Sequence, residues 1–148
     1  MEIENLIQAL YNNRKIDSKN QFKIFQASIE ELANYSIPSH LLPQLMRVLD
    51  DSCESYEVMY GLIHLIESTG DEYISILVQN TSDLYPHAKR WLQTLYIAIL
   101  NDEKSTLVLK NILKDSHLIN EPLRSIFSMI VKRNPNRFES KVKALMEL

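Results

Sequence analysis

The side chains that most often carry chemistry are few in this chain and lie far apart. None of the four histidines belongs to an HExxH motif or to another spacing that places two metal ligands on one helical face. His64 and Glu67 are three residues apart, but the di-iron motif has the opposite order, Glu-x-x-His, and requires a second copy. The sequence therefore predicts no metal site and no cofactor. The other histidines are His40, His87 and His117.

Nucleophilic catalysis is not indicated either. The single cysteine, Cys53, has no evident histidine partner, no serine lies in a nucleophile elbow, and no glycine-rich loop is present to hold phosphate. We therefore expect that the protein is not an enzyme. A single cysteine also excludes an internal disulfide, which agrees with a reducing compartment.

Charge is distributed unevenly along the sequence, although the net charge is only −3. The segment from Asp50 to Ala88 contains eight acids and no Lys or Arg, whereas Lys104 to Lys143 contains nine bases and three acids. Stacked helices would convert this separation along the chain into a separation in space, which could steer a charged partner. The other explanation, that these are ordinary solvated faces, remains open. Aromatic residues are sparse in the basic part, so nucleic acid is not the expected partner.

The segment from Ser55 to Gly70 is the helix around which we expect the chain to be organised. Ser55 can accept a hydrogen bond from the first turn, and Gly70 can adopt the left-handed conformation that ends a helix. Two apolar stripes cover most of its circumference, which predicts that it packs on two sides. These stripes are Val58, Leu62 and Leu65, and Tyr56, Met59, Tyr60, Ile63 and Ile66.

The remaining stripe of this helix is polar and contains Glu57, Gly61, His64 and Ser68, with Glu67 at its edge. A glycine in the middle of a helix costs about 1 kcal/mol relative to alanine. Gly61 therefore suggests the close approach of another helix or of a ligand.

Helical periodicity continues through the rest of the chain, and no strand is indicated. We expect about nine antiparallel helices, over residues 3–12, 18–33, 39–49, 55–70, 71–80, 86–100, 102–113, 120–131 and 135–146. Candidate helix starts recur every 14 to 18 positions, so a helical pair occupies just over thirty residues. They are the capping candidates Ser39, Ser55, Asp71, Asp102, Asn120 and Asn134, with Pro86 marking one more start. This spacing favours an irregular HEAT-like α-solenoid or a compact α-array, with a plain helical bundle as the alternative.

The length of 148 residues suits one domain, residues 1–148. The N-terminal residues MEIENL do not resemble a signal peptide, and the longest strongly apolar run, Leu95 to Leu100, has six residues. We therefore expect no membrane association and a cytoplasmic location.

The run YEVMYGLIHLIES, followed by LYPHAKRWLQTLYIAILNDE, resembles bacterial immunity proteins of polymorphic toxin systems, most closely immunity protein family thirty. The resemblance spans about Ser39 to Leu113. It rests on the central helix with His64 and Glu67, and on the Trp91 helix that ends in Leu100-Asn101-Asp102. Tyr96 departs from the family pattern, which has a histidine there. The resemblance implies a small cytoplasmic helical protein that binds and neutralises a cognate toxin without catalysis.

The acidic segment is the expected toxin-binding surface, because opposite charge accelerates association with a basic partner such as a nuclease. The expected binding residues are Asp50, Asp51, Glu54, Glu57, His64, Glu67 and, as an anchor from the neighbouring helix, Trp91. Against this interpretation, the acids could complement a helix dipole, and Trp91 could be a core residue. The alternative function is a HEAT-like adaptor or regulatory subunit that acts on an intracellular partner. The sequence does not indicate an oligomeric state.

Overall fold

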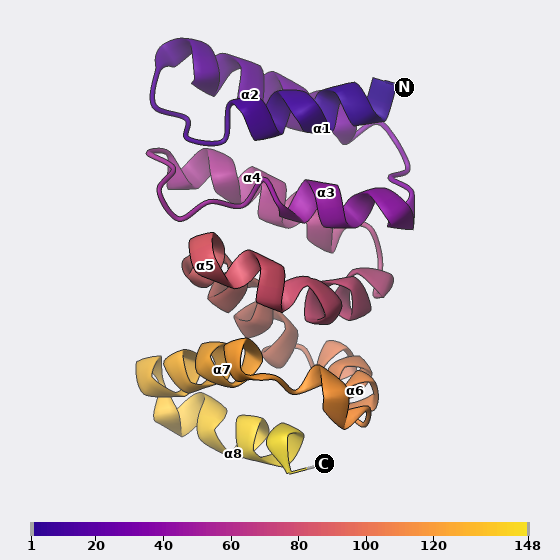
Figure 1. Ribbon diagram of the computed structural model, residues 1–148, viewed down its shortest axis with the longest axis vertical. Helices are drawn as coiled ribbons and strands as arrows, with labels where there is room; N and C mark the ends of the chain where they lie inside the picture. Colours follow the sequence, from indigo (N-terminus) through magenta and orange to yellow (C-terminus); the bar gives the residue numbers. More distant parts are fainter. Residues whose placement is uncertain (1, 148) are drawn as a thin grey trace. The chain divides into compact units, whose positions relative to one another are not determined.

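The computed structural model describes residues 2–147 and is all-α, as the periodicity predicts (Figure 1). Within these residues there are eight α-helices, two short 3-10 helices and no strand. The α-helices are α1 (Glu2–Asn12), α2 (Lys19–Leu32), α3 (Leu42–Met46), α4 (Tyr56–Glu67), α5 (Glu72–Leu100), α6 (Glu103–Ile112), α7 (Glu121–Arg133) and α8 (Pro135–Met146). The 3-10 helices are η1 (Ser39–Leu41) and η2 (Ser116–Leu118).

The chain divides into two compact units, Met1–Tyr73 and Ile74–Leu148, where the sequence predicts one domain. The boundary falls in the first turn of α5. Each unit contains its own set of buried apolar side chains.

The first unit is built from two antiparallel helical pairs. Figure 1 shows α1 beside α2, and α3 beside α4. Packing of α2 against α4 and of α1 against α3 joins the two pairs. Phe25 and Leu32 of α2, Leu45 and Met46 of α3, and Leu62 of α4 are fully buried. The fold of this unit therefore fixes the orientation of α4.

One side of α4 is core and another is open, which only partly matches the prediction of a helix packed on two sides. Met59, Leu62, Ile63, Leu65 and Ile66 are buried as expected. Tyr56 and Tyr60, however, are each 40% exposed. A tyrosine tolerates such a position because its ring can lie on an apolar surface while its hydroxyl stays in water.

The ends of α4 also differ in detail from the expectation. Ser55 occupies the N-cap position, but its side chain makes no capping hydrogen bond. Gly70 has the expected positive φ, 102°, and lies three residues beyond the last helical residue, Glu67.

Four other helices begin with a side-chain cap. In each, the side-chain oxygen accepts a hydrogen bond from the backbone N–H three residues later, which satisfies a donor that the first helical turn leaves unpaired. These caps are Ser18, which the sequence predicts only as a helix start, and Asp102, Asn120 and Asn134, which confirm predicted capping residues. The predicted cap Ser39 is wrong, because η1 precedes α3 and starts without a side-chain cap.

In the second unit, α5 replaces two predicted helices. The sequence predicts that one helix ends near Asn80 and another begins at Pro86, whereas α5 continues for 29 residues with a kink at Ala88 (φ −136°, ψ 30°). Proline has no N–H to donate and its ring crowds the preceding turn, so it kinks a helix. The prediction of nine helices is wrong for this reason.

A buried hydrogen bond joins the two halves of α5 across the kink. The hydroxyl oxygens of Thr81 and Tyr96 are 2.7 Å apart, and both side chains are fully buried. Burial raises the pKa of Tyr96 far above its ordinary value, and the hydrogen bond with Thr81 opposes that rise only in part. The Tyr96 ring also packs edge-on against Phe127 of α7, with ring centroids 5.2 Å apart.

Two cations of the basic segment hold α8 against the C-terminal end of α5. Lys141 Nζ donates to the backbone oxygen of Leu100 at 2.7 Å, and Arg137 Nε donates to Asn101 Oδ1 at 2.8 Å. The partial negative charge at a helix C-terminus favours cations there. Part of the basic charge in the sequence therefore has a structural role.

Candidate functional site, an acidic face of the first unit

Asp50 is a buried carboxylate at the centre of a polar cluster and not an exposed binding residue. It is only 5% exposed. Its Oδ1 accepts hydrogen bonds from the backbone N–H and the hydroxyl of Ser52, at 2.8 and 2.6 Å. Its Oδ2 lies 3.0 Å from Lys15 Nζ and 3.4 Å from Arg14 Nε. Burial alone would raise the pKa of Asp50, but the hydrogen bonds from Ser52 and Lys15 outweigh burial and hold the pKa below its ordinary value.

This cluster joins the connection between α1 and α2 to the connection between α3 and α4. The backbone N–H of Glu54 also donates to the Lys15 carbonyl at 2.8 Å, and Lys15 Nζ donates to Ser52 Oγ at 2.6 Å. Between these contacts, Ile16 is buried with φ +51°, a conformation that a β-branched residue rarely adopts. The backbone before α4 is therefore held in place.

The remaining predicted residues of the first unit lie on this connection and on α4. Glu54, Glu57 and His64 are exposed, while Asp51 and Glu67 are half-buried. Partial burial raises the pKa of Glu67, and the neighbouring His64 opposes that rise. We call Asp51, Glu54, Glu57, His64 and Glu67 the acidic face.

Trp91 lies in the core of the second unit. Its side chain has no exposed surface and is the largest of the fully buried residues. In this fold Trp91 is therefore a core residue, and it cannot anchor a partner. Its position on the apolar side of α5, with Leu92 and Leu95 also fully buried, accounts for this burial.

Three exposed aromatic side chains near the acidic face were not predicted as site residues. Tyr56 and Tyr60 lie one turn apart on α4, on either side of Glu57 in the sequence. Phe22 of α2 is also 40% exposed. A signal for the exposure of the two tyrosines was present in the sequence: Tyr56 and Tyr60 are four residues apart and lie directly beside the polar stripe of the same helix.

A groove of about 450 Å³ lies between α2 and α4 beside the acidic face. Its lining residues are Phe22, Gln26, Ile29 and Glu30 of α2, and Glu57, Val58 and Gly61 of α4. Phe22 also lines a neighbouring hollow, which includes Ile16, Lys19 and Glu54.

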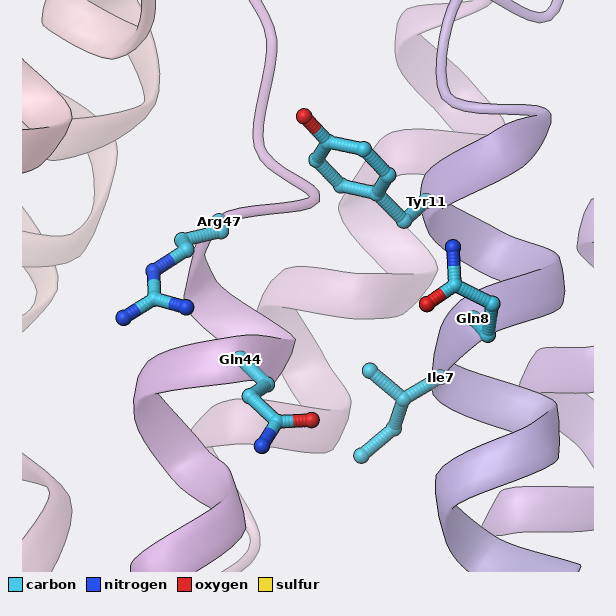
Figure 2. Close-up of a pocket in the computed structure, with 5 residues that line it drawn as sticks. All are labelled: Ile7, Gln8, Tyr11, Gln44 and Arg47. Atoms are coloured by element: carbon cyan, nitrogen blue, oxygen red, sulfur yellow. The ribbon is translucent and has the colours of Figure 1, made fainter.

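Figure 2 shows a different hollow, of about 260 Å³, between α1 and α3. Ile7, Gln8 and Tyr11 of α1 face Gln44 of α3 and Arg47, the residue after α3, across it. Its only charged lining residue is Arg47, so its sign is opposite to that of the groove between α2 and α4.

Residues 2–147 contain neither a cluster of metal-ligating side chains nor a membrane-spanning helix. No group of three or more His, Cys, Asp or Glu side chains among them could hold a metal ion. None of the helices in the described part of the chain is long and apolar enough to cross a bilayer. The single cysteine, Cys53, is buried.

Exposed tyrosines bordered by charged side chains are typical of surfaces that bind other proteins. In residues 2–147 the fold is all-helical, and the exposed Tyr56 and Tyr60 lie beside acidic side chains of α4. The family model for immunity protein 30 matches residues 12–109. The chain belongs to the immunity protein 30 family.

Membership of this family confirms the resemblance seen in the sequence and implies that the chain neutralises a toxin. Immunity proteins are generally inhibitors without catalytic activity, in agreement with the prediction that the chain is not an enzyme. The match extends from the end of α1 into α6, and α7 and α8 lie beyond it. No curated protein and no solved structure matches the chain.

Proposed function

We propose that this chain binds a cognate toxin of a bacterial polymorphic toxin system through the acidic face and neutralises it by direct contact. The family supports toxin neutralisation. The observation that carries the choice of surface is that Glu54, Glu57 and His64 are exposed on one held segment and its helix. Such a preorganised surface loses little conformational entropy on binding.

The partner that fits this surface is a basic protein, and a toxin nuclease is a suitable class. Nucleases carry cations that contact phosphate, and carboxylates placed opposite those cations would occupy the same site. Opposite charge also raises the rate of association at low ionic strength.

The second candidate function is a helical adaptor or regulatory subunit that acts on an intracellular partner. Its support is the packing of consecutive helices in pairs, α1 with α2 and α7 with α8, as HEAT-like repeats do. We propose the same irregular HEAT-like pairing for the toxin-binding function, so the pairing does not separate the two candidates. Growth of cells that co-express the chain with the toxin encoded beside it separates them, because an adaptor would not restore growth.

The test of the binding surface is surface plasmon resonance against that toxin at 50 and 500 mM salt. In the double variant Asp51→Lys with Glu54→Lys, we expect the association rate at 50 mM salt to fall by about tenfold or more, and by much less at 500 mM. The dissociation rate and the melting temperature should change little.

The matched control is Glu121→Lys with Glu139→Lys, which makes the same change in net charge at two exposed positions of the second unit. It should retain most of the association rate. If the acidic-face variant associates as fast as the wild type, or if both double variants slow equally, this surface is not the binding site.

A further inference from the structure

We propose that the groove between α2 and α4 receives an arginine side chain of the cognate toxin. This inference rests on the proposed function and names the chemical group that the toxin inserts. The groove is lined by apolar side chains, two carboxylates and an exposed aromatic ring. The apolar side chains match the aliphatic stem of arginine, and the carboxylates and the ring match its guanidinium.

The charge of the groove selects a cation. Its ionisable lining residues are Glu30 of α2 and Glu57 of α4, which are both exposed and come from opposite sides. Gln26 Nε2 lies 3.4 Å from Glu30 Oε1, at the same side of the groove. The lysines nearest in sequence, Lys19 and Lys23, line the neighbouring hollow and not the groove. A cation entering between the two carboxylates would therefore be attracted by both.

The apolar and aromatic lining of the groove favours arginine over lysine as that cation. Ile29 and Val58 can contact an aliphatic stem, and Phe22, which is 40% exposed, offers a ring face. A guanidinium is planar, stacks on aromatic rings and pairs with carboxylates through two parallel hydrogen bonds. A lysine ammonium would use the charge but not the ring geometry, so arginine fits the groove better.

Gly61 gives a second, independent reason to assign a ligand to this groove. A glycine within a helix costs about 1 kcal/mol relative to alanine. Packing does not demand it, because a Cβ added at Gly61 would meet its nearest neighbour, Ile29 Cγ2, at 3.6 Å, an ordinary van der Waals distance. A side chain at this position would instead project into the groove that Gly61 lines. The glycine therefore keeps the groove open.

The first test removes the charge of the groove without changing its shape. The double variant Glu30→Gln with Glu57→Gln should bind the toxin encoded beside the chain about tenfold or more weakly, mainly through faster dissociation. The control, Glu121→Gln with Glu139→Gln, makes the same charge change at exposed positions of the second unit and should bind like the wild type. Equal affinity of the groove variant and the wild type would overturn the inference.

The second test fills the groove. Gly61→Met should weaken toxin binding by a similar factor while the chain remains folded, and Gly61→Ala should weaken binding by a smaller factor while raising the melting temperature. If Gly61→Met weakens binding only as far as it unfolds the chain in circular dichroism, the Glu30 and Glu57 variants decide the matter. Full binding by a folded Gly61→Met variant contradicts the proposal.

A double-mutant cycle identifies the occupant. Each basic residue on the toxin's binding surface is replaced by alanine and measured against the wild type and against the Glu30→Gln, Glu57→Gln variant. One arginine should lose its contribution in the variant background. Coupling to a lysine alone, or to no basic residue, would overturn the assignment of arginine.

The outcomes for the groove and for the proposed function are distinguishable. Failure of the wild-type chain to bind the toxin or restore growth would contradict the proposed function. Binding by the wild type together with unchanged binding by the groove variants would contradict only the groove assignment.

Discussion

Asp50 illustrates how one carboxylate can differ in role from its neighbours in sequence. It lies in the same run of acids as Asp51 and Glu54, so composition places all of them on a binding surface. In the structure, four polar atoms lie within hydrogen-bonding or ion-pair distance of the Asp50 carboxylate. They are the backbone N and the Oγ of Ser52, Lys15 Nζ and Arg14 Nε. Asp50 therefore contributes to the stability of the fold. It also fixes the position of the connection before α4, on which the acids that follow it lie.

The residue-scale prediction is that Asp50→Asn destabilises the chain by about 1–3 kcal/mol at pH 7, because hydrogen bonds to a charged acceptor are lost. The folded-state pKa of Asp50 is lowered, so its stabilisation is present above the unfolded value near 3.8 and is lost as the pH falls through the folded-state pKa. Urea titrations of both proteins at pH 7 and at pH 3 measure this difference, which should shrink at the lower pH. Glu54→Gln, at an exposed position, should have little effect at either pH.

At the scale of helices, local signals in the sequence predict the structure correctly where a cap or an apolar stripe depends only on neighbouring residues. Asp102, Asn120 and Asn134 cap the helices they were expected to cap, and Leu62 is buried as its stripe predicts. These outcomes depend on a few neighbouring residues, which is why periodicity and capping rules find them.

The predictions fail where packing between residues far apart in the sequence determines the structure. The kink at Ala88 replaces a helix start at Pro86 because the turns on both sides are held by buried contacts such as Thr81 with Tyr96. The periodicity assigns Tyr56 and Tyr60 to an apolar stripe, yet each side chain is 40% exposed. Trp91, conversely, is covered completely. Periodicity identifies an apolar side but cannot say which apolar side another helix covers.

The element-scale prediction concerns the buried side of α4. Leu62→Ala should cost about 2–5 kcal/mol, because burial is lost and a cavity remains in the first unit. Leu107→Ala on α6 is the matched control, because this leucine is 58% exposed and its truncation should leave the stability nearly unchanged. Thermal and urea unfolding followed by circular dichroism compare the two. Similar stabilities for both variants would show that α4 is peripheral to the fold.

For the whole molecule, the position of the boundary between the two units bears on how the chain unfolds. The boundary between Tyr73 and Ile74 falls in the first turn of α5 and not in a linker, and the side chains on either side of it are buried. The residues around it, from Asp71 to Ser75, include no proline, and Gly70 precedes the helix. Separation of the units in unfolding would therefore have to break a helical turn.

We accordingly predict that residues 1–148 unfold as one cooperative domain. In differential scanning calorimetry, the wild-type chain should show a single transition whose calorimetric and van't Hoff enthalpies agree, because unfolding of one unit removes the helical turn that the other continues. Leu62→Ala in the first unit should shift that whole transition to lower temperature, and Tyr96→Phe in the second should do the same by a smaller amount, since it removes one buried hydrogen bond. Two resolved transitions, of which each variant shifts only one, would mean that the units are independent domains. The acidic face and the groove beside it would then belong to a first domain able to bind the toxin alone.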